Sequence, residues 1–231
     1  KIKKYLKKLM VIDDLNRNHV CDYLFQQSLG SKKPTSKKNI FTGDKYFIVD
    51  EKYIKPHKII KNNKKKNLKI LINFGSNDVK NLTCKFLKYI KLNLLEYKIY
   101  VVVEDDFKFF QELKKLVNKR VIIYKNQFSL YNLTLKSDIC IGAGGMHNIE
   151  RVSLGKLSYV VKTSENQKNN INYLKQKKLI IYLGTKNKFN FNLIKFENFK
   201  NNFLNSQSLK LKKNLHLNGI LNISKIINQI N

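Results

Sequence analysis

The turn Gly142-Ala143-Gly144-Gly145 contains the residue types in this sequence that are best suited to hold an anion. It follows the apolar run Asp138 to Ile141 and precedes a segment of helical period, Met146 to Leu154. Glycine lets the backbone approach a phosphate closely, and the free N–H groups and dipole at a helix start favour negative charge. The pattern predicts a phosphate site at Gly142, Gly144, Gly145 and Met146, although a Gly-rich turn equally serves as a tight strand-to-helix connection.

Two side chains near the start of that helix are suited to complete such a site. Glu150 lies one helical turn beyond the loop, where a carboxylate can accept both hydroxyls of a ribose while a diphosphate rests on the loop. A Glu at this point also fits a plain interaction with the helix dipole. His147 lies in the first turn, where a protonated imidazole can contact a phosphate.

Polar residues also follow two other apolar runs. Gly75 and Asp78 come after Leu68 to Phe74, and either Asp78 or Asn81 is suited to cap the next helix. After Leu157 to Val161 come a carboxylate and two amides, which are suited to sugar hydroxyls: Glu165, Asn166 and Gln167. For these three, the residues alone favour the alternative of a helix cap with a polar first turn.

The remaining chemistry-bearing residues give weaker patterns. Asp13 and Asp14 end a short apolar run, but adjacent strand residues point to opposite faces, so they form no shared-proton pair, and one of them can still reach a cleft. The histidines show neither metal-ligand spacing nor a nucleophile beside them. Cys21, Cys84 and Cys140 form no C-x-x-C pair. We expect no metal and no cofactor.

The elements that must position these residues form an α/β pattern. From Leu68 onward, short apolar runs alternate with helical periods such as Leu82, Phe86, Ile90 and Leu94, which predicts parallel strands buried on both faces and joined by crossover helices. We expect six such strands: Leu68 to Phe74, Tyr100 to Val103, Val121 to Tyr124, Asp138 to Ile141, Leu157 to Val161 and Leu179 to Leu183. Two shorter strands precede them, at Leu9 to Ile12 and Tyr23 to Gln26.

Composition divides the chain further. Residues 55–67 are rich in charge and poor in apolar side chains, which is typical of a linker. We therefore expect residues 1–60 to be one partial domain with its linker, residues 61–213 a ligand-binding domain, and residues 214–231 a closing helix marked by Ile223, Ile226, Ile227 and Ile230.

The net charge of +30 is the feature that most suggests nucleic acid, but its chemistry argues otherwise. Nearly all of the excess is Lys, and Arg, which direct base readout needs, occurs only at Arg17, Arg120 and Arg151. We expect no specific nucleic-acid partner, no membrane span, a reducing cytoplasmic location and a monomer. The absence of an initiator Met leads us to expect a piece of a longer gene product.

Taken in order, the motifs resemble those of the UDP-2,4-diacetamido-2,4,6-trideoxy-β-L-altropyranose hydrolases of pseudaminic acid biosynthesis, within the glycosyltransferase family 28 C-terminal-domain-like group. The matching segments span almost the whole chain: Val11-Ile12-Asp13-Asp14-Leu15; Cys21-Asp22 with Gln27-Ser28-Leu29-Gly30; Gly43 with Tyr46; Phe74-Gly75 with Asp78 and Asn81-Leu82-Thr83; and Gly142 to Gly145 through Glu150-Arg151 and Leu154-Gly155 to Glu165-Asn166-Gln167.

This resemblance implies a GT-B-like fold with a Rossmann-like C-terminal domain, preceded by the remnant of a truncated N-terminal α/β domain. It implies hydrolysis of a UDP-linked diacetamido-trideoxy sugar for surface glycans. The loop and helix start would hold the diphosphate, Glu150 the ribose and Phe128 the uracil side, with Gly75 lining the cleft. The sugar would contact Asp13, Asp14, Asp78, Glu165, Asn166 and Gln167.

The departures concern the attacking side of the site. The family carries a Gly-rich loop with a His that activates water, and no such loop precedes Leu9, so the catalytic base is unassigned and His19 does not take its place. Ser76 stands where a second Gly is usual, and Leu157 where Pro is usual. A UDP-sugar glycosyltransferase with the same donor site and a non-catalytic nucleotide-sugar-binding protein therefore remain alternatives.

Overall fold

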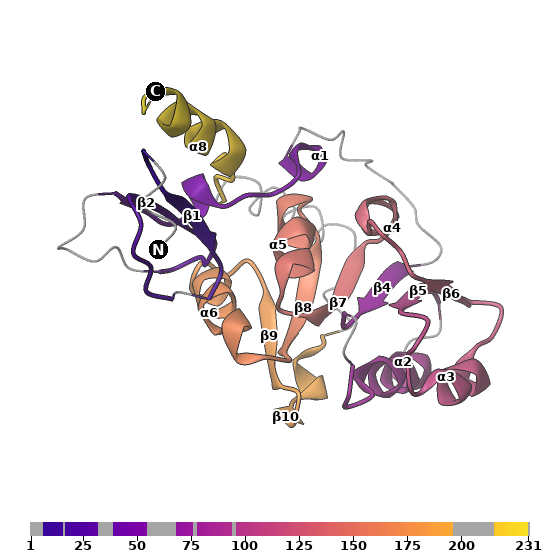
Figure 1. The fold of residues 1–231 in the computed structure, drawn as a ribbon. Helices are drawn as coiled ribbons and strands as arrows, with labels where there is room; N and C mark the ends of the chain where they lie inside the picture. Colours follow the sequence, from indigo (N-terminus) through magenta and orange to yellow (C-terminus); the bar gives the residue numbers. More distant parts are fainter. Residues whose placement is uncertain are drawn as a thin grey trace.

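The computed structural model of the protein describes residues 7–15, 17–31, 39–54, 68–75, 78–93, 96–195 and 215–230. These residues form two β-sheets with helices packed on them (Figure 1). The expected linker at residues 55–67 lies outside the described residues, as do Ser76 and Leu94.

The larger sheet confirms the α/β prediction. Its seven strands lie in the order β10-β9-β8-β7-β4-β5-β6, and every neighbouring pair is parallel except β9 with β10. The strands are β4 (Leu68–Asn73), β5 (Tyr97–Val103), β6 (Val121–Lys125), β7 (Ile139–Ala143), β8 (Leu157–Lys162), β9 (Ile181–Thr185) and β10 (Lys188–Phe189).

Six of these strands match the apolar runs of the sequence, with shifted ends. β5 begins three residues before Tyr100, because Tyr97 and Ile99 already point into the core while Lys98 does not, a polar alternation that hides the strand start. β9 begins two residues after Leu179, since Lys178 turns the chain with a φ of 57°. β10 was not predicted, because two residues are too few to give a periodic signal.

Helices cover both faces of this sheet, and alternation along each strand divides the core accordingly. Ile70 and Ile72 face α2 (Leu82–Asn93) and α3 (Phe110–Leu116), whereas Leu71 packs with α4 (Tyr131–Lys136). The other helices are α5 (Met146–Ser153) and α6 (Lys168–Gln176), which pack on the α4 side at β8. Parallel strands therefore have apolar side chains on both faces, as their unbroken runs require.

The strand order places a topological switch point between β4 and β7. From β4 the chain winds outward through β5 to β6, and then returns to β7 on the other side of β4 before continuing to β8. The loops that leave β4 and β7 consequently run in opposite directions from adjacent strands. In open α/β sheets the crevice for a ligand lies at this point, beyond the carboxyl ends of the strands.

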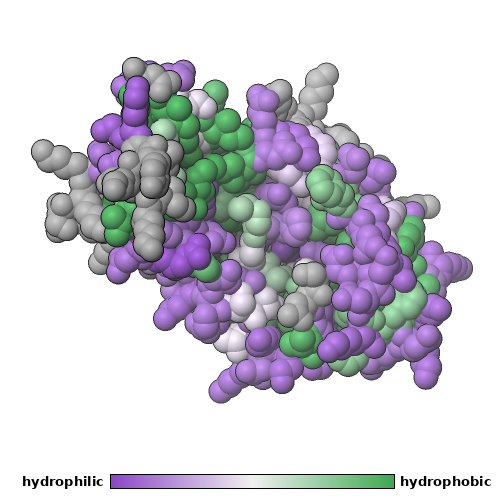
Figure 2. All heavy atoms as spheres, viewed as in Figure 1, coloured by the Kyte–Doolittle hydropathy of each residue, from purple (hydrophilic) through white to green (hydrophobic). Residues whose placement is uncertain are grey.

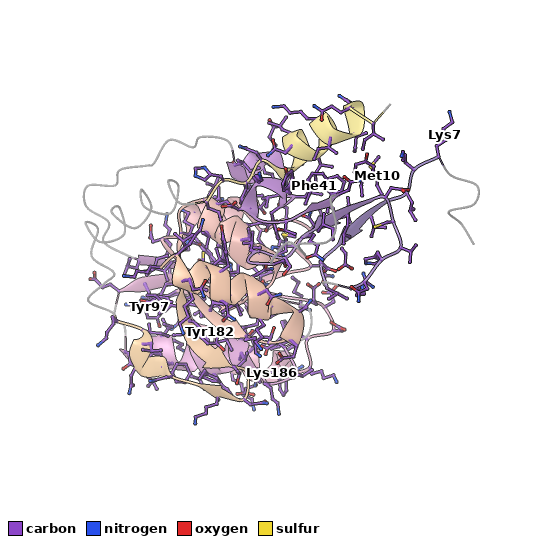
Figure 3. All side chains as sticks on the ribbon, turned by 90° about the vertical axis from the view of Figure 1, so that its left-hand side faces the viewer. Lys7, Met10, Phe41, Tyr97, Tyr182 and Lys186 are labelled. Carbon is purple, nitrogen blue, oxygen red and sulfur yellow. The ribbon has the colours of Figure 1, made fainter. Side chains whose placement is uncertain are left out.

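The smaller sheet is parallel and contains β1 (Met10–Asp13), β2 (Tyr23–Gln26) and β3 (Ile40–Phe41). The pattern had given the first two strands, and the two-residue β3 was missed. The sheet lies beside α8 (Gly219–Asn228), with Met10 and Phe41 close to that helix in Figure 3. Ile12 on β1 is 56% exposed and Val20 85%, and apolar side chains gather on this part of the surface in Figure 2.

The chain between the two sheets includes η2 (Asp44–Tyr46) and α1 (Glu51–Ile54), and short 3-10 turns η3 (Glu165–Gln167) and η4 (Phe191–Leu193) lie in the larger sheet's region. The smaller sheet is tied to α6. The backbone N–H of Leu29, a fully buried residue, donates to Asn170 Oδ1 at 2.6 Å. The Tyr173 hydroxyl donates to Asp44 Oδ2 at 2.9 Å.

We expect Asn170→Ala to lower the melting temperature, because it leaves the buried N–H of Leu29 without its acceptor. An unsatisfied buried donor costs about 1–3 kcal/mol, which corresponds to a fall of roughly 2 to 10 °C in a chain of this size. Circular dichroism melts measure the effect. Asn172→Ala, at an exposed position of the same helix, is the matched control and should leave the melting temperature unchanged. Equal melting temperatures of the two variants would contradict a stabilising hydrogen bond between Leu29 and Asn170.

Candidate functional site

The Gly142–Gly145 loop lies where β7 ends beside β4. Asn73 pairs with Gly142 across the two strands, and a Cβ added to Gly142 would lie 1.9 Å from the Asn73 carbonyl oxygen. A Cβ on Gly144 would lie 2.4 Å from Ile171 Cδ1 on α6. Both glycines are thus required by the packing of the fold, which supports the tight-connection interpretation at these two positions.

Gly145 differs from the other two glycines of the loop. A Cβ at this position would meet nothing nearer than Gln167 Nε2, at 3.8 Å, and its φ of −77° suits any residue. Packing and backbone conformation therefore do not explain a glycine here. A bare Cα facing open space at the start of α5 is suited to the close approach of a ligand.

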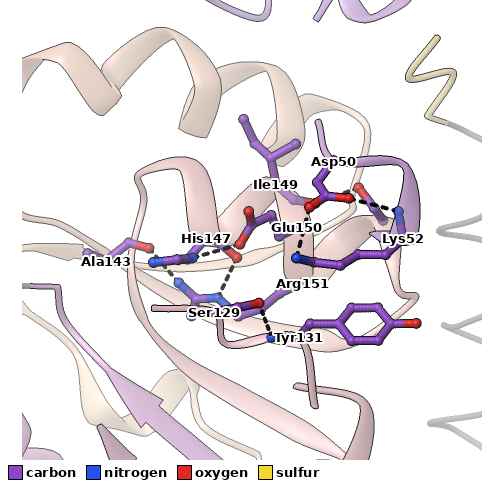
Figure 4. Close-up of polar contacts among 10 residues, drawn as sticks. Asp50, Lys52, Ser129, Tyr131, Ala143, His147, Ile149, Glu150 and Arg151 are labelled. Carbon is purple, nitrogen blue, oxygen red and sulfur yellow. Dashed lines mark hydrogen bonds and ion pairs between the residues drawn. The ribbon is translucent and has the colours of Figure 1, made fainter. Parts of the chain in front are cut away.

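Arg151 lies buried beneath this loop, with 2% of its surface exposed. Its guanidinium donates to two carbonyl oxygens, from Nε to His147 at 2.9 Å and from Nη2 to Ala143 at 2.8 Å (Figure 4). Burial lowers the pKa of Arg151, but arginine starts so high that it stays charged at neutral pH. Residue spacing did not indicate a role for Arg151, and the signal that could have found it is that it is one of three Arg in a chain whose other basic residues are Lys and His.

Glu150 and His147 face each other on the first two turns of α5. Glu150 Oε2 lies 2.6 Å from His147 Nδ1, and their side chains are 15% and 43% exposed (Figure 4). The Tyr53 side chain lies near Glu150 and Ser129, and both residues affect its pKa. Burial raises the pKa of Tyr53 to about 12, and the charge of Glu150 acts in the same direction. The Glu150 carboxylate thus has protein partners on α5 and α1.

Gln167 is the predicted sugar residue that contacts the glycine loop. Its Oε1 accepts from the Gly144 N–H at 3.3 Å and the Thr163 N–H at 2.9 Å. Its side chain does not cap α6, so the cap interpretation fails for this residue. Glu165 instead pairs with Lys162 at 2.6 Å in an exposed position, and Asn166 Oδ1 accepts from the Ser164 hydroxyl at 2.5 Å.

Asp78 takes the capping position that the sequence offered as one of its roles. Its Oδ1 accepts from the Leu82 N–H and its Oδ2 from the Thr83 N–H, both at 2.8 Å. Burial raises the pKa of this carboxyl, against the lowering effect of those two hydrogen bonds. Gly75, with a φ of 80° and open space around its Cα, marks the end of β4 at the switch point.

Asp13 and Asp14 differ in environment. The Asp13 side chain is buried, and its carboxylate accepts from the Leu15 and Arg17 backbones, from Arg17 Nε at 2.6 Å, and lies 3.2 Å from His19 Nε2. Burial alone would raise the pKa of Asp13, but the hydrogen bonds from Arg17 and His19 outweigh it and lower the pKa to about 2. Asp14 is exposed. The Asp13 carboxylate therefore holds the turn over residues 13–19.

Phe128 is fully exposed in the loop between β6 and α4, next to Ser129, whose contact with Tyr53 brings that loop toward Glu150. Within the described residues, no three His, Cys, Asp or Glu side chains are grouped as metal ligands. The arrangement offers a helix start, a buried cation, an open glycine and a partnered carboxylate at one sheet edge. These groups can bind an anion.

No protein-family model matches the chain. An uncharacterized protein of Methanocaldococcus jannaschii is 30% identical over 183 aligned positions, which cover 72% of this chain and 38% of that protein. The chain thus spans well under half the length of this curated relative.

Solved structures share the fold. MurG of Acinetobacter baumannii matches with a TM-score of 0.65 at 14% identity, over 98% of this chain and 68% of that one. WaaG, a glycosyltransferase involved in lipopolysaccharide biosynthesis, matches with a TM-score of 0.54 at 12% identity, over 75% and 51%. Spinosyn rhamnosyltransferase SpnG, solved with thymidine diphosphate, also gives 0.54 at 12%, over 89% and 57%.

The chain therefore has a GT-B-like α/β fold, as the resemblance predicted. Structural similarity at 12% to 14% sequence identity shows the fold alone. It does not identify the chain as a pseudaminic-type hydrolase. In the part of the chain that the structure describes, no helix is long and apolar enough to cross a membrane.

The loop glycines should differ in their tolerance of a methyl group. We expect Gly142→Ala to prevent folding or lower the melting temperature strongly, because its Cβ meets backbone at 1.9 Å, whereas Gly145→Ala should fold like the unchanged protein. Soluble yield and thermal melts measure both variants. A stably folded Gly142→Ala would contradict the close approach of β4 and β7.

Asp13 should make stability depend on pH. Its pKa is lowered to about 2 in the folded state from an ordinary 3.8, so its contribution is present above about pH 4 and is lost as the pH falls toward 2. Asp13→Asn should therefore lower the melting temperature at pH 6, with a difference that shrinks between pH 4 and pH 2. Asp14→Asn, the exposed neighbour, should show no such difference at any pH.

Proposed function

We propose that this chain binds the nucleoside diphosphate part of a nucleotide sugar at the switch point between β4 and β7. The observation that carries the proposal is the Gly145 and Met146 start of α5, open to solvent above the buried charge of Arg151. The first N–H groups of a helix have no acceptor within the helix, and the dipole adds partial positive charge there. A diphosphate supplies the acceptors and the compensating charge.

The neighbouring residues then have the following proposed roles around the diphosphate. Gly142 and Gly144 shape the loop, and His147 turns one ring nitrogen to Glu150, which leaves the other for a phosphate oxygen. Glu150 accepts the ribose hydroxyls in exchange for one of its present partners. Phe128 offers an exposed ring for the base, since a flat apolar face stacks on any nucleobase.

The resemblance supports UDP as the nucleotide and a diacetamido-trideoxy hexose as the sugar. Water would attack the sugar C1, the bond from C1 to the diphosphate oxygen would break, and UDP would leave with its charge on the loop. Gln167 is the sugar residue best supported by its contact with Gly144. Gly75 lines the opposite side, with Asp14, Glu165 and Asn166 as exposed candidates, while Asp13 and Asp78 can act only if they release backbone contacts.

Two alternatives remain open. The fold matches include glycosyltransferases, and SpnG is solved with thymidine diphosphate, so transfer to an acceptor uses the same donor half of the site equally well. A non-catalytic nucleotide-sugar-binding protein fits as well, because no residue of this chain is assigned as the base. Release of free sugar and UDP without an acceptor separates hydrolysis from both.

The division of the chain is also proposed: a partial N-terminal domain with linker over residues 1–60, the binding domain over 61–213 and a closing helix segment over 214–231. A parallel sheet is normally covered on both faces, and Ile12 on β1 is exposed. This supports β1 to β3 as part of a larger sheet. Cys21, Cys84 and Cys140 form no disulfide bond, which fits the proposed cytoplasmic location, and a monomer remains our expectation.

UDP should raise the melting temperature of the purified protein more than AMP does, because a ligand that binds only the folded state stabilises it. Differential scanning fluorimetry with both nucleotides at millimolar concentration measures the shift. The absence of any shift with UDP would refute the proposed site.

Glu150→Ala should remove most of the UDP shift, since the carboxylate that holds His147 and faces the ribose is lost. Glu96→Ala, an exposed carboxylate just before β5 at the amino edge of the sheet, is the matched control and should keep the full shift. If the two variants respond alike to UDP, Glu150 has no role in binding.

A further inference from the structure

Arg151 is buried under the glycine loop in a way that fixes the direction of one peptide. Its Nη2 donates a hydrogen bond to the Ala143 carbonyl oxygen at 2.8 Å. Every described peptide is trans, and in a trans peptide the C=O and N–H point in opposite directions. The N–H of Gly144 therefore points away from Arg151, toward Gln167 Oε1 at 3.3 Å on the other side.

The second contact of the guanidinium extends this control to the helix. Nε donates to the His147 carbonyl at 2.9 Å, so one planar group joins Ala143 in the loop to His147 in the first turn of α5. Nη1 lies 2.8 Å from the position that a Cβ on Gly142 would take. The planar fork of Arg matches several carbonyl positions at once, which the single ammonium of Lys does not.

Among the described residues, no carboxylate forms an ion pair with the Arg151 guanidinium. The hydrogen-bond acceptors of Arg151 are carbonyl oxygens, and the neighbouring Glu150, whose charge favours the charged guanidinium, is bonded to His147 instead. A buried charge without an opposite charge is costly unless it is paired. An anion bound above the loop would offset the charge of Arg151, with only the loop backbone between them.

We propose that Arg151 is the positioning residue of the anion site, and that it makes the loop select ligands by their charge. It orients the Gly144 N–H away from itself, toward Gln167, and supplies positive charge from beneath, so the diphosphate part of a ligand depends on it and the nucleoside part does not. This inference rests on the proposed function, since it assumes that the loop holds an anion. A purely structural Arg would affect folding alone.

The test compares Arg151→Met and Arg151→Lys with Arg120→Met, an exposed Arg before β6 that serves as the control. Binding of UDP, uridine and inorganic pyrophosphate is measured by NMR titration. Arg151→Met should weaken UDP and pyrophosphate about tenfold or more and change uridine less than twofold. Arg151→Lys, which keeps the charge without the fork, should restore part of the pyrophosphate affinity, and Arg120→Met should change none of the three.

An equal loss for UDP and uridine, or no loss for either, overturns the proposal. If Arg151→Met does not fold, Arg151→Lys decides: a loss for pyrophosphate with unchanged uridine supports the inference, and unchanged pyrophosphate overturns it. A third outcome separates the two proposals. If pyrophosphate binding depends on Arg151 but the unsubstituted protein binds UDP no better than AMP, the nucleotide assignment is refuted and the role of Arg151 stands. A protein that binds no anion refutes both.

Discussion

The Asn73 carbonyl oxygen on β4 occupies the space that a side chain at position 142 of β7 would need. This close approach follows from the strand order, because β7 returns to the free side of β4 after β6. It also determines where the site lies, since the two loops that leave these strands diverge at that edge. Gly75 and Gly145, which follow these two strands, both have open space where a Cβ would lie.

The chemistry at this edge depends on groups that sit below the surface. Arg151 is buried, whereas each Lys in the described part of the chain is exposed or half-buried, so the net charge of +30 says little about where an anion would bind. A cation under a layer of backbone is screened by solvent far less than one on a long exposed side chain.

The polar residues predicted to contact the sugar differ in how far the fold already uses them. Asp78 caps α2 and Asp13 holds its own turn, each through hydrogen bonds from backbone N–H groups. Gln167 differs, because its amide joins the loops that follow β7 and β8. A residue that links two loops at the crevice can respond to a ligand, whereas one that caps a helix would lose stability by doing so.

Apolar runs and turn residues in the sequence determined six parallel strands, the helix after the glycine loop and the place of that loop, because a strand buried on both faces needs an unbroken apolar run. They did not give β3 or β10, since two-residue strands exist only through their neighbours. Only the tertiary structure decided which glycines serve packing and which faces open space, because that depends on Asn73 and Ile171, far away in the chain. It also decided that Arg151 is buried under the loop and that Glu150 pairs with His147 and lies near Tyr53 of α1, since such contacts leave no periodic trace in the sequence.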